Sequence, residues 1–572
     1  MAKSPPDKPV HGDVDIGRRT FVTRGGAALA SGAALASAGA LATARERCGA
    51  DDGSGPESAE ARARPWHRPN LLFLITDQER YPQHWPEGWA ETQLPNRRRL
   101  ADRGLTFTRH YCNAAMCTPS RATLVTGLFA AQHRVTQVLQ YGGPNDDGTP
   151  GYTAQTTLQP GLQNIGRMLL DAGYDVQYRG KWHLSKDPTG TLPVQSPRDL
   201  AHYGFHGWIP PEAGTDQAAA VFGGGDTDYD TGYAAQAAQF LRSADAHSAR
   251  PFALFVCFAN PHDVMGYPST WNEPSYSDIP PYEGSDNYGK DVPLCFRQHI
   301  DLPCTASEPP FGNHKPPAQA RSTLMWAKGL GPLPSQRSKL NYVNFYAWVT
   351  RESDRHFGTV LDALECNAGL RDKTVVFALS DHGEMGLAHG GMREKAYNAY
   401  EETIHVPLVV SNPAMFPAPV RTAALPSLID LMPTVASFAG VQNRGRYLFM
   451  GKDLTPVIQD AVDHPGHPTR TVQDSIYFTT DETLGEEIVG QPSHLRCLRE
   501  ADWKIVEYFD PSGDKRSLFE LYDLVDDPLE LHNMGSPANV AWFNPAKLAE
   551  MIAKLDRRTE EIDSHPPGRP PR

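Results

Sequence analysis

The sequence predicts an α/β fold: a large, mixed but mostly parallel sheet sandwiched by helices, followed by a smaller C-terminal α+β unit with an antiparallel sheet. Two observations predict the larger unit. Short apolar runs alternate with helical stretches from Pro69 onward, which is typical of a parallel sheet covered on both faces. Several runs also end in polar residues, and the ligand site of an open α/β sheet lies beyond the carboxyl ends of its strands.

Four of the apolar runs are predicted strands, namely residues 71–75, 175–178, 252–258 and 374–379. The polar residues that follow them are Asp77-Gln78, Lys181-Trp182-His183, His262-Asp263 and Asp381-His382. A helical pattern over 342–364 precedes the fourth run. The carboxylates of Asp77 and Asp381 would repel each other at one sheet edge, so a cation is expected between them.

Cys117 stands where a helix is predicted to begin. Thr118 can cap that helix, Pro119 suits its first position and Gly127 suits its end. The helix start favours anions, and Arg121 lies one turn further on the same face. A thiolate phosphatase would need arginine six positions after the cysteine, but Thr123 stands there, so that class is excluded.

Residues 117–121, Cys-Thr-Pro-Ser-Arg, resemble the CxPxR signature of the type I, formylglycine-dependent sulfatases of the alkaline-phosphatase-like superfamily. Other blocks of that family occur in the family's order, at Asp77-Gln78, Gly180-Lys181-Trp182-His183, His262, Asp381-His382-Gly383, Lys395 and 521–528. The resemblance extends from about Asn70 to about Met534. It implies a sulfuric ester hydrolase that acts on a small-molecule or carbohydrate sulfate ester.

The resemblance implies one divalent metal, held by Asp77, Gln78, Asp381, His382 and an oxygen of modified Cys117. Mostly oxygen ligands favour Ca²⁺, and the imidazole leaves Mn²⁺ or Mg²⁺ open. Many family members carry a second Asp where Gln78 stands and Asn where His382 stands, so the metal's identity stays open.

The resemblance also implies catalytic roles. Cys117 would be oxidised to formylglycine, whose hydrate supplies the nucleophile, and Arg121 would orient it. Lys181 and Lys395 would bind the sulfate group and neutralise its oxygens. His262, with Lys395, would bind substrate and assist the leaving alcohol, while His183 would take the proton whose removal releases sulfate.

Taken singly, such lysines and histidines are ordinary surface or loop residues. Asp263 and His389 lie next to motif residues, and we expect them in the substrate pocket.

Two alternatives remain. The first is a phosphonate or phosphate diester hydrolase of the same superfamily, in which the positions of Lys181 and His183 resemble Tyr and Thr, so this sequence favours sulfate. The second is a non-catalytic sulfate-ester binding protein, which the complete CxPxR stretch argues against.

Residues 1–44 resemble a twin-arginine signal, with Arg18-Arg19 before an Ala-rich run that ends in Ala42-Thr43-Ala44. The expected partners are therefore export machinery and a formylglycine-generating enzyme, and the expected location is periplasmic, cell-surface or secreted. No stable membrane insertion is expected after cleavage, and the net charge of −13 argues against nucleic acid.

The predicted organisation continues with a leader over 45–65 and a catalytic domain over 66–440 that contains an irregular insertion, 265–339. A C-terminal subdomain over 441–560 and a disordered tail over 561–572 follow. Among the eight cysteines, Cys295 and Cys304 are candidates for a disulfide, whereas Cys366 is predicted to be an incidental thiol.

Overall fold

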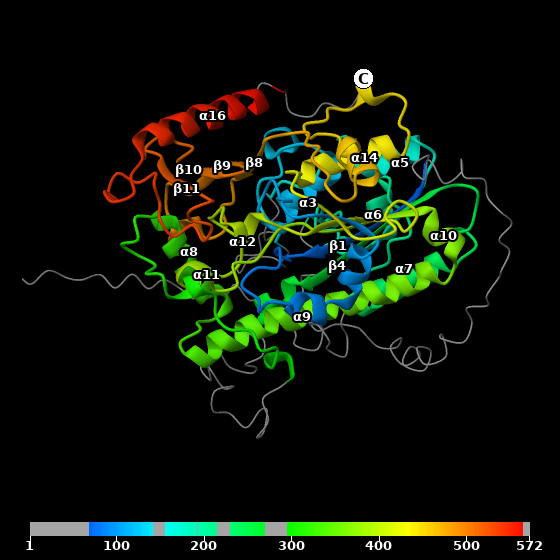
Figure 1. Cartoon of the computed structure of the whole chain (residues 1–572), viewed down its shortest axis with the longest axis horizontal. Coiled ribbons are helices and arrows are strands. Elements are labelled where there is room, and N and C mark those ends of the chain that lie inside the picture. The colour runs from blue at the N-terminus through cyan, green and yellow to red at the C-terminus, as the bar shows by residue number, and fades with distance from the viewer. Residues whose placement is uncertain are drawn as a thin grey trace, which may run out of the picture.

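The computed structural model describes residues 68–140, 155–190, 193–213, 229–268, 294–563 and 565. The predicted signal, the leader and part of the predicted insertion lie outside these residues. Figure 1 shows the arrangement of the described elements. Among the described residues, no helix has the length and apolar character needed to cross a membrane.

The larger unit is built on a seven-stranded sheet in the order β3-β4-β1-β5-β6-β2-β7. The strands are β1 (Asn70–Asp77), β2 (Gly104–Phe107), β3 (Asp175–Gly180), β4 (Phe252–Pro261), β5 (Thr374–Ser380), β6 (Leu408–Ser411) and β7 (Val420–Thr422). All neighbours pair in parallel except β6, which runs antiparallel to both β5 and β2. The predicted mixed, mostly parallel sheet is confirmed.

The strands of this sheet bury both of their faces, because successive side chains point to opposite sides. In β1, Leu71, Phe73 and Ile75 join one core, whereas Leu72 and Leu74 join another. The first core packs against the helices α3 (Cys117–Thr126), α5 (Ile165–Asp171), α13 (Leu431–Phe438) and α14 (Thr455–Asp463). The second packs against α7 (Tyr229–Leu241) and α9 (Gln336–Glu365), which lie on the other side of the sheet in Figure 1.

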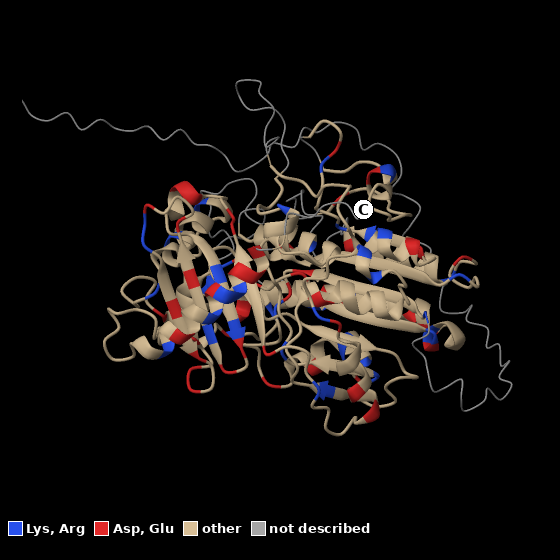
Figure 2. Cartoon of the chain, turned by 90° about the horizontal axis from the view of Figure 1, so that it is seen from above, with Lys and Arg blue, Asp and Glu red and all other residues tan. Residues whose placement is uncertain are grey.

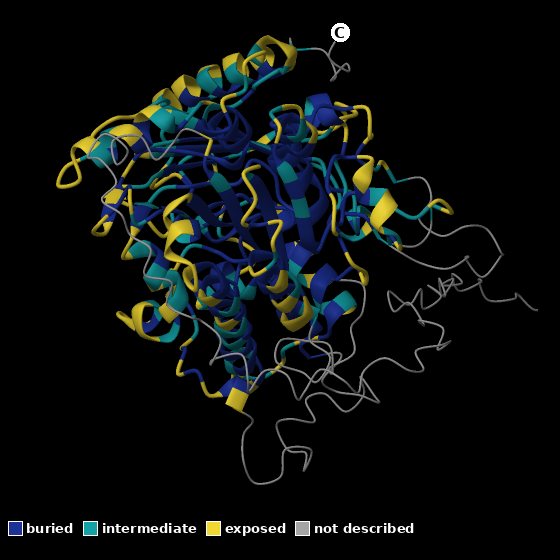
Figure 3. Cartoon of the chain, turned by 90° about the vertical axis from the view of Figure 1, so that its right-hand side faces the viewer, coloured by how far each residue is buried: buried dark blue, intermediate teal, exposed yellow. Residues whose placement is uncertain are grey.

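The smaller unit is an antiparallel sheet in the order β11-β10-β9-β8, covered by one helix. Its elements are β8 (Ser475–Thr480), β9 (His494–Glu500), β10 (Trp503–Phe509), β11 (Leu518–Asp523) and α16 (Pro545–Asp563). Met551 and Leu555 of α16 pack on Ile505 and Leu521 of the sheet. Figure 3 shows the opposite face of α16 exposed and the strands of the central sheet buried. This unit also matches the prediction, although α16 continues three residues past the expected boundary at 560.

Shorter elements connect these layers. The remaining α-helices are α1 (Trp89–Gln93), α2 (Pro95–Ala101), α4 (Ala130–His133), α6 (Pro197–Ala201), α8 (Pro317–Leu330), α10 (Ala368–Asp372), α11 (Ala388–Gly391), α12 (Glu401–Ile404) and α15 (Glu486–Val489). The 3₁₀ turns are η3 (His262–Gly266), η7 (Leu294–Phe296), η8 (Cys304–Ser307), η9 (Leu428–Asp430) and η10 (Arg444–Arg446). Figure 2 shows basic and acidic residues interspersed over the elements of both units.

The structure corrects four expectations. The stretch 265–339 is not irregular throughout, because it contains α8 and the beginning of α9. Cys295 and Cys304 are both free thiols, so that pairing is wrong. Cys366 is disulfide-bonded and not an incidental thiol. The helix α3 begins at Cys117 itself and has no side-chain cap, so Thr118 does not cap it.

Candidate active site

The predicted site residues meet at the carboxyl edge of the central sheet. Strands β3, β4, β1 and β5 are neighbours, so the residues that end or follow them are delivered side by side. The register pairs Thr76 with Ser380, which places Asp77 beside Asp381. All ten predicted residues are buried: Asp77, Gln78, Cys117, Arg121, Lys181, His183, His262, Asp381, His382 and Lys395.

The backbone at this edge is too crowded for larger residues at two glycines. A Cβ atom at Gly180 would lie 1.9 Å from the carbonyl oxygen of Cys257, and one at Gly383 would lie 2.0 Å from the carbonyl oxygen of Glu402. Gln78 and His183 also adopt positive φ angles of 70° and 53°. Such strained residues cluster at functional sites, because surrounding contacts must hold them in place.

Arg121 bridges the two carboxylates that the strands deliver. It reaches them from the first turn of α3, with Nη2 2.8 Å from Oδ2 of Asp77 and Nε 2.9 Å from Oδ2 of Asp381. Its Nη1 donates a hydrogen bond to the backbone carbonyl of Lys181 at 2.9 Å. The arginine of the CxPxR stretch therefore ties three strand ends to the helix that begins at Cys117.

A second group of side-chain atoms, all able to bind a metal, surrounds the sulfur of Cys117. Nε2 of His382 lies 3.3 Å from Sγ, and Oδ1 of Asp77 lies 3.5 Å from it. The same nitrogen lies 3.7 Å from Oδ1 of Asp77 and 3.6 Å from Oδ1 of Asp381. Asp77, Cys117 and His382 thus form a group able to hold a metal ion.

The chemistry of these groups suits a divalent cation, because carboxylate oxygens and an imidazole nitrogen are common metal ligands. Sγ of Cys117 stands in for the oxygen of an oxidised side chain. The donor set of carboxylates, one imidazole and that position therefore fits one divalent ion.

The electrostatics also favour a bound cation. Burial and the nearby Asp77 carboxylate raise the pKa of Asp381 to about 6, so the two acids resist being charged together. Burial and Asp77 act to raise the pKa of the Cys117 thiol, but Lys181, Lys395 and His382 outweigh them and hold it well below its usual value. The position of Cys117 is thus one that stabilises negative charge.

Gln78 is fixed by two buried glutamates that the motif analysis missed. Its Nε2 donates to Oε2 of Glu384 at 2.5 Å and to Oε1 of Glu394 at 3.2 Å. Its Oε1 accepts a 2.5 Å hydrogen bond from Nζ of Lys395. Because both glutamates are acceptors, the amide can point only its oxygen toward Lys395 and the site. Glu384 directly follows Asp381-His382-Gly383 and Glu394 directly precedes Lys395, so proximity to motifs was the available signal.

The two lysines and His262 surround the sulfur. Nζ of Lys181 lies 2.8 Å from Oδ2 of Asp77 and 3.9 Å from Sγ of Cys117. His262 follows β4 in η3 and lies close enough to Cys117 for the two side chains to interact electrostatically. Burial and Lys181 lower the pKa of His262, whereas the pKa of Lys395 is raised by Cys117 and Glu394 despite its burial.

His183 lies two residues beyond Lys181, with its imidazole against a neighbouring loop. Its Nε2 is 2.8 Å from the carbonyl oxygen of Leu139. A carbonyl only accepts, so Nε2 carries the proton and Nδ1 is the basic nitrogen. The carboxylate of Glu212, another residue that the motifs missed, accepts a 2.8 Å hydrogen bond from the preceding backbone N–H of Trp182.

Asp263 and His389, which were expected in the substrate pocket, lie in different surroundings. Asp263 is buried beside His262 in η3. His389 lies in another polar cluster, where Nδ1 is 2.9 Å from Glu308 and Nε2 is 3.6 Å from Glu402, and its ring stacks on Tyr400. These partners are not among the predicted site residues.

The sequence is similar to those of known sulfatases. Residues 69–441 match the family model described as sulfatase, and residues 390–561 match the C-terminal model of N-sulphoglucosamine sulphohydrolase. An N-acetylglucosamine-6-O-sulfatase of Bacteroides thetaiotaomicron is 24% identical, with 87% of this chain and 88% of that protein covered. A choline-sulfatase of Rhizobium meliloti is 26% identical, with 87% of each chain covered.

Solved structures share the fold. A protein in complex with its substrate D-glucosamine-2-N,6-O-disulfate has a TM-score of 0.60 at 20% identity, covering 87% of this chain and 98% of that one. A phosphonate monoester hydrolase of Agrobacterium radiobacter has a TM-score of 0.59 at 22% identity, covering 86% and 96%.

Proposed function

Because the chain belongs to the sulfatase family, we propose that it hydrolyses organic sulfate esters with formylglycine at position 117 and one divalent metal. The observation that carries the proposal is the convergence of Asp77 and His382 on Sγ of Cys117, within 3.3–3.5 Å. Lys181 also lies 3.9 Å from this sulfur, and the positive charges of Lys181 and Lys395 act on it.

The metal would be held by Asp77, Gln78, Asp381, His382 and the side chain at 117. The separations of 3.3–3.7 Å among Asp77, Cys117, Asp381 and His382, with the largely oxygen chemistry, support Ca²⁺, whose ligands lie at 2.3–2.6 Å. Ligands of the smaller Mg²⁺ at 2.0–2.1 Å would lie only about 2.8–3.0 Å apart. The imidazole keeps Mn²⁺ as a second candidate. When bound, the metal and the hydrated formylglycine would supply a nucleophile activated at neutral pH.

The cationic side chains bind and neutralise the sulfate group. Lys181 and Lys395 are buried beside Cys117 and have raised pKa values, so they stay protonated at neutral pH. A preorganised positive charge in a water-excluded site stabilises the negative charge that the reaction builds on oxygen. Arg121 holds Asp77 and Asp381 in place and thereby fixes the direction of attack.

Lys395 and His183 serve the two halves of the reaction. The lowered pKa of His262 keeps its imidazole neutral in the free protein, so Lys395 supplies the positive charge that stabilises the leaving alcohol, and His262 assists by binding substrate. His183 presents Nδ1 as a base because Nε2 is bound to the carbonyl of Leu139. His183 is therefore the residue suited to remove the proton that precedes sulfate release.

The substrate would be a small-molecule or carbohydrate sulfate ester. Relatives named for N-acetylglucosamine-6-O-sulfate, choline sulfate and aryl sulfates support the reaction class without choosing among alcohols. The acidic net charge of −13 disfavours long, heavily sulfated polymers.

The protein would be exported after maturation. The twin-arginine pattern at Arg18-Arg19 supports export, and the disulfide at Cys366 supports an oxidising compartment. Export machinery and a formylglycine-generating enzyme would then be its partners.

Hydrolysis of phosphonate monoesters or phosphate diesters is the second candidate, since hydrolases of phosphonate monoesters share the fold at a TM-score of 0.59. The presence of Lys181 and His183 favours sulfate. Turnover of an aryl sulfate and the matching aryl phosphonate by the same metal-loaded preparation would decide between them. Faster phosphonate cleavage would reverse the assignment, and binding of both esters without turnover would favour a non-catalytic binding protein.

A further inference from the structure

Glu482 lies in the C-terminal unit, two residues after β8 ends, and is buried against a loop of the catalytic unit. Its Oε2 accepts a 2.8 Å hydrogen bond from the backbone N–H of Val138. Its Oε1 accepts 2.9 Å hydrogen bonds from the N–H groups of Thr483 and Leu484, in its own loop. Three backbone N–H groups, one from the catalytic unit and two from the C-terminal unit, therefore donate to this carboxylate.

The same loop of the catalytic unit contacts two residues of the candidate site. The N–H of Leu139 donates to Oγ1 of Thr118 at 3.0 Å, directly beside Cys117. The carbonyl oxygen of Leu139 accepts the proton on Nε2 of His183 at 2.8 Å. One residue, Leu139, therefore touches both the neighbour of Cys117 and the predicted base.

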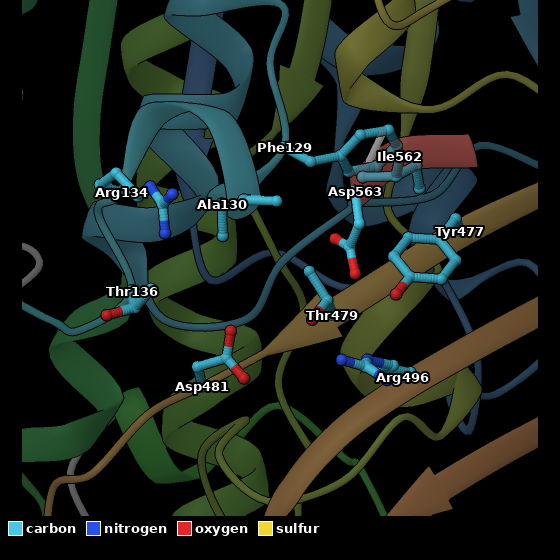
Figure 4. A pocket seen from close by; sticks show the side chains of 11 residues that line it. Phe129, Ala130, Arg134, Thr136, Tyr477, Thr479, Asp481, Arg496, Ile562 and Asp563 are labelled. Atoms are coloured by element: carbon cyan, nitrogen blue, oxygen red, sulfur yellow. The ribbon is translucent and has the colours of Figure 1, made fainter. Parts of the chain in front are cut away.

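A second hydrogen bond joins this loop to the C-terminal unit. Nε2 of Gln137 donates to Oγ1 of Thr483 at 2.7 Å, one residue before Val138. Upstream, the two segments of the chain line different sides of a cavity of about 130 Å³. Arg134 and Thr136 lie on one side of it and Asp481 on another (Figure 4). The hydrogen bond from the Val138 N–H to Glu482 therefore lies between the part of the loop that lines the cavity and the part that contacts the site.

We propose that Glu482 is a positioning residue for His183: by holding Val138, it fixes the carbonyl of Leu139 and so selects the Nε2–H form of His183. Only the backbone torsions of Val138 and Leu139 lie between the N–H that Glu482 holds and the Leu139 carbonyl, because the peptide plane that joins the two residues is rigid. The N–H of Leu139 is itself held by Thr118, so a fixed Val138 limits the directions that the Leu139 carbonyl can take. The catalytic part of this inference rests on the proposed function, whereas the positioning part does not.

The variant Glu482→Gln tests the positioning part and the catalytic part of this inference separately. A glutamine has one acceptor oxygen, which the N–H groups of Thr483 and Leu484 can retain, and its NH₂ group would then face the Val138 N–H without accepting from it. The matched control is Asp430→Asn, which alters another buried carboxylate that accepts backbone hydrogen bonds, from Ser427 at 2.7 Å and Lys452 at 2.6 Å.

The experiment uses the full, matured chain and three readouts. Hydrogen–deuterium exchange followed by mass spectrometry reports opening of peptides covering 134–140. Nitrogen-15 NMR of histidine-labelled protein reports the tautomer of His183, assigned with a His183→Gln sample. Steady-state kinetics with an aryl sulfate report kcat, KM and the pH profile.

In Glu482→Gln we expect exchange over 134–140 to rise by about tenfold or more, since a locally held segment is released. We also expect mixed tautomers at His183 and a fall in kcat of about 10–100-fold with KM changed far less, as for other outer hydrogen-bond partners of catalytic groups. Asp430→Asn should leave the exchange, the tautomer and the pH profile as in the parent protein.

Unchanged exchange and an unchanged tautomer in Glu482→Gln would overturn the inference. It would also be overturned if both changed while kcat and the pH profile did not. If the parent protein cleaves no sulfate ester, the proposed function fails, but exchange and tautomer still decide whether Glu482 positions His183.

Discussion

Sγ of Cys117 lies 3.3 Å from Nε2 of His382, although 265 residues separate them along the chain. The contact exists because α3 begins at Cys117 and points its first turn at the end of β5. It joins two sequence motifs into a single centre that also contains Asp77.

Removal of the metal should abolish turnover and lower the melting temperature, because Asp77 and Asp381 would then share only the positive charge of Arg121. Activity should return on addition of Ca²⁺ or, less completely, Mn²⁺. Metal content by elemental mass spectrometry and melting by calorimetry measure both effects before and after chelation.

The matched variants are Asp77→Asn and Asp354→Asn. Asp77→Asn should weaken metal affinity at least about tenfold. Asp354 is also buried and paired, 3.2 Å from Arg97, but lies outside the site, so Asp354→Asn should retain one metal per chain. Equal metal content in both variants would contradict the assignment of Asp77 as a ligand.

Lys395→Met should lower kcat by about 10²–10³-fold, because it removes a positive charge directed at the reacting oxygens. Steady-state kinetics on the folded fraction, measured by near-ultraviolet circular dichroism, check this. Lys504→Met is the control, since Lys504 is equally buried and paired with Glu401 at 3.2 Å, but lies between the two units. Both variants should lose stability. A similar fall in kcat for both would show that Lys395 acts through folding alone.

Glu401 should make stability depend on pH. Burial acts to raise the pKa of Glu401, but Arg499 and Lys504 outweigh it and hold the pKa below its usual value. A lowered pKa means that the stabilisation is full above the unfolded pKa of about 4.3 and is lost as pH falls toward the folded pKa. Glu401→Gln should therefore cost about 3–5 kcal/mol of unfolding free energy at pH 7, where it leaves buried charges unpaired.

Urea unfolding at pH 7, 5 and 3.5 measures this cost, which should shrink at the lowest pH. Glu352→Gln provides the comparison, because Glu352 pairs with the exposed Arg355 at 2.9 Å. That surface pair should contribute less than about 1 kcal/mol. A cost for Glu401→Gln that does not decrease with acidification would contradict the linkage.

The sequence predicted the elements whose apolar runs were long enough to show a period. Strands β1, β4 and β5 have seven to ten residues and were anticipated within a few residues, as was α9. Strands β6 and β7 have four and three residues, and such short runs carry too little pattern to distinguish them from loops. The helix α8 was missed because it begins at Pro317 within a Pro-rich stretch.

The site was predictable where a motif marked it, and less so elsewhere. Asp77, Cys117 and Asp381 each stand at the end or start of a strong element, so topology brings them together. Glu384 and Glu482 act through hydrogen bonds to Gln78 and Val138. Glu384 stands next to a motif, whereas nothing in the local sequence of Glu482 distinguishes a buried acceptor from a surface acid. Such partners depend on tertiary contacts that periodicity does not encode.

The central claim is that an oxidised side chain at position 117 performs the chemistry beside one metal ion. It is tested most directly by mass analysis of the peptide that carries Cys117, taken from a preparation whose turnover of an aryl sulfate has been measured. We predict that formylglycine replaces cysteine in proportion to the specific activity. Full activity in a preparation in which Cys117 remains an unmodified thiol would contradict the account.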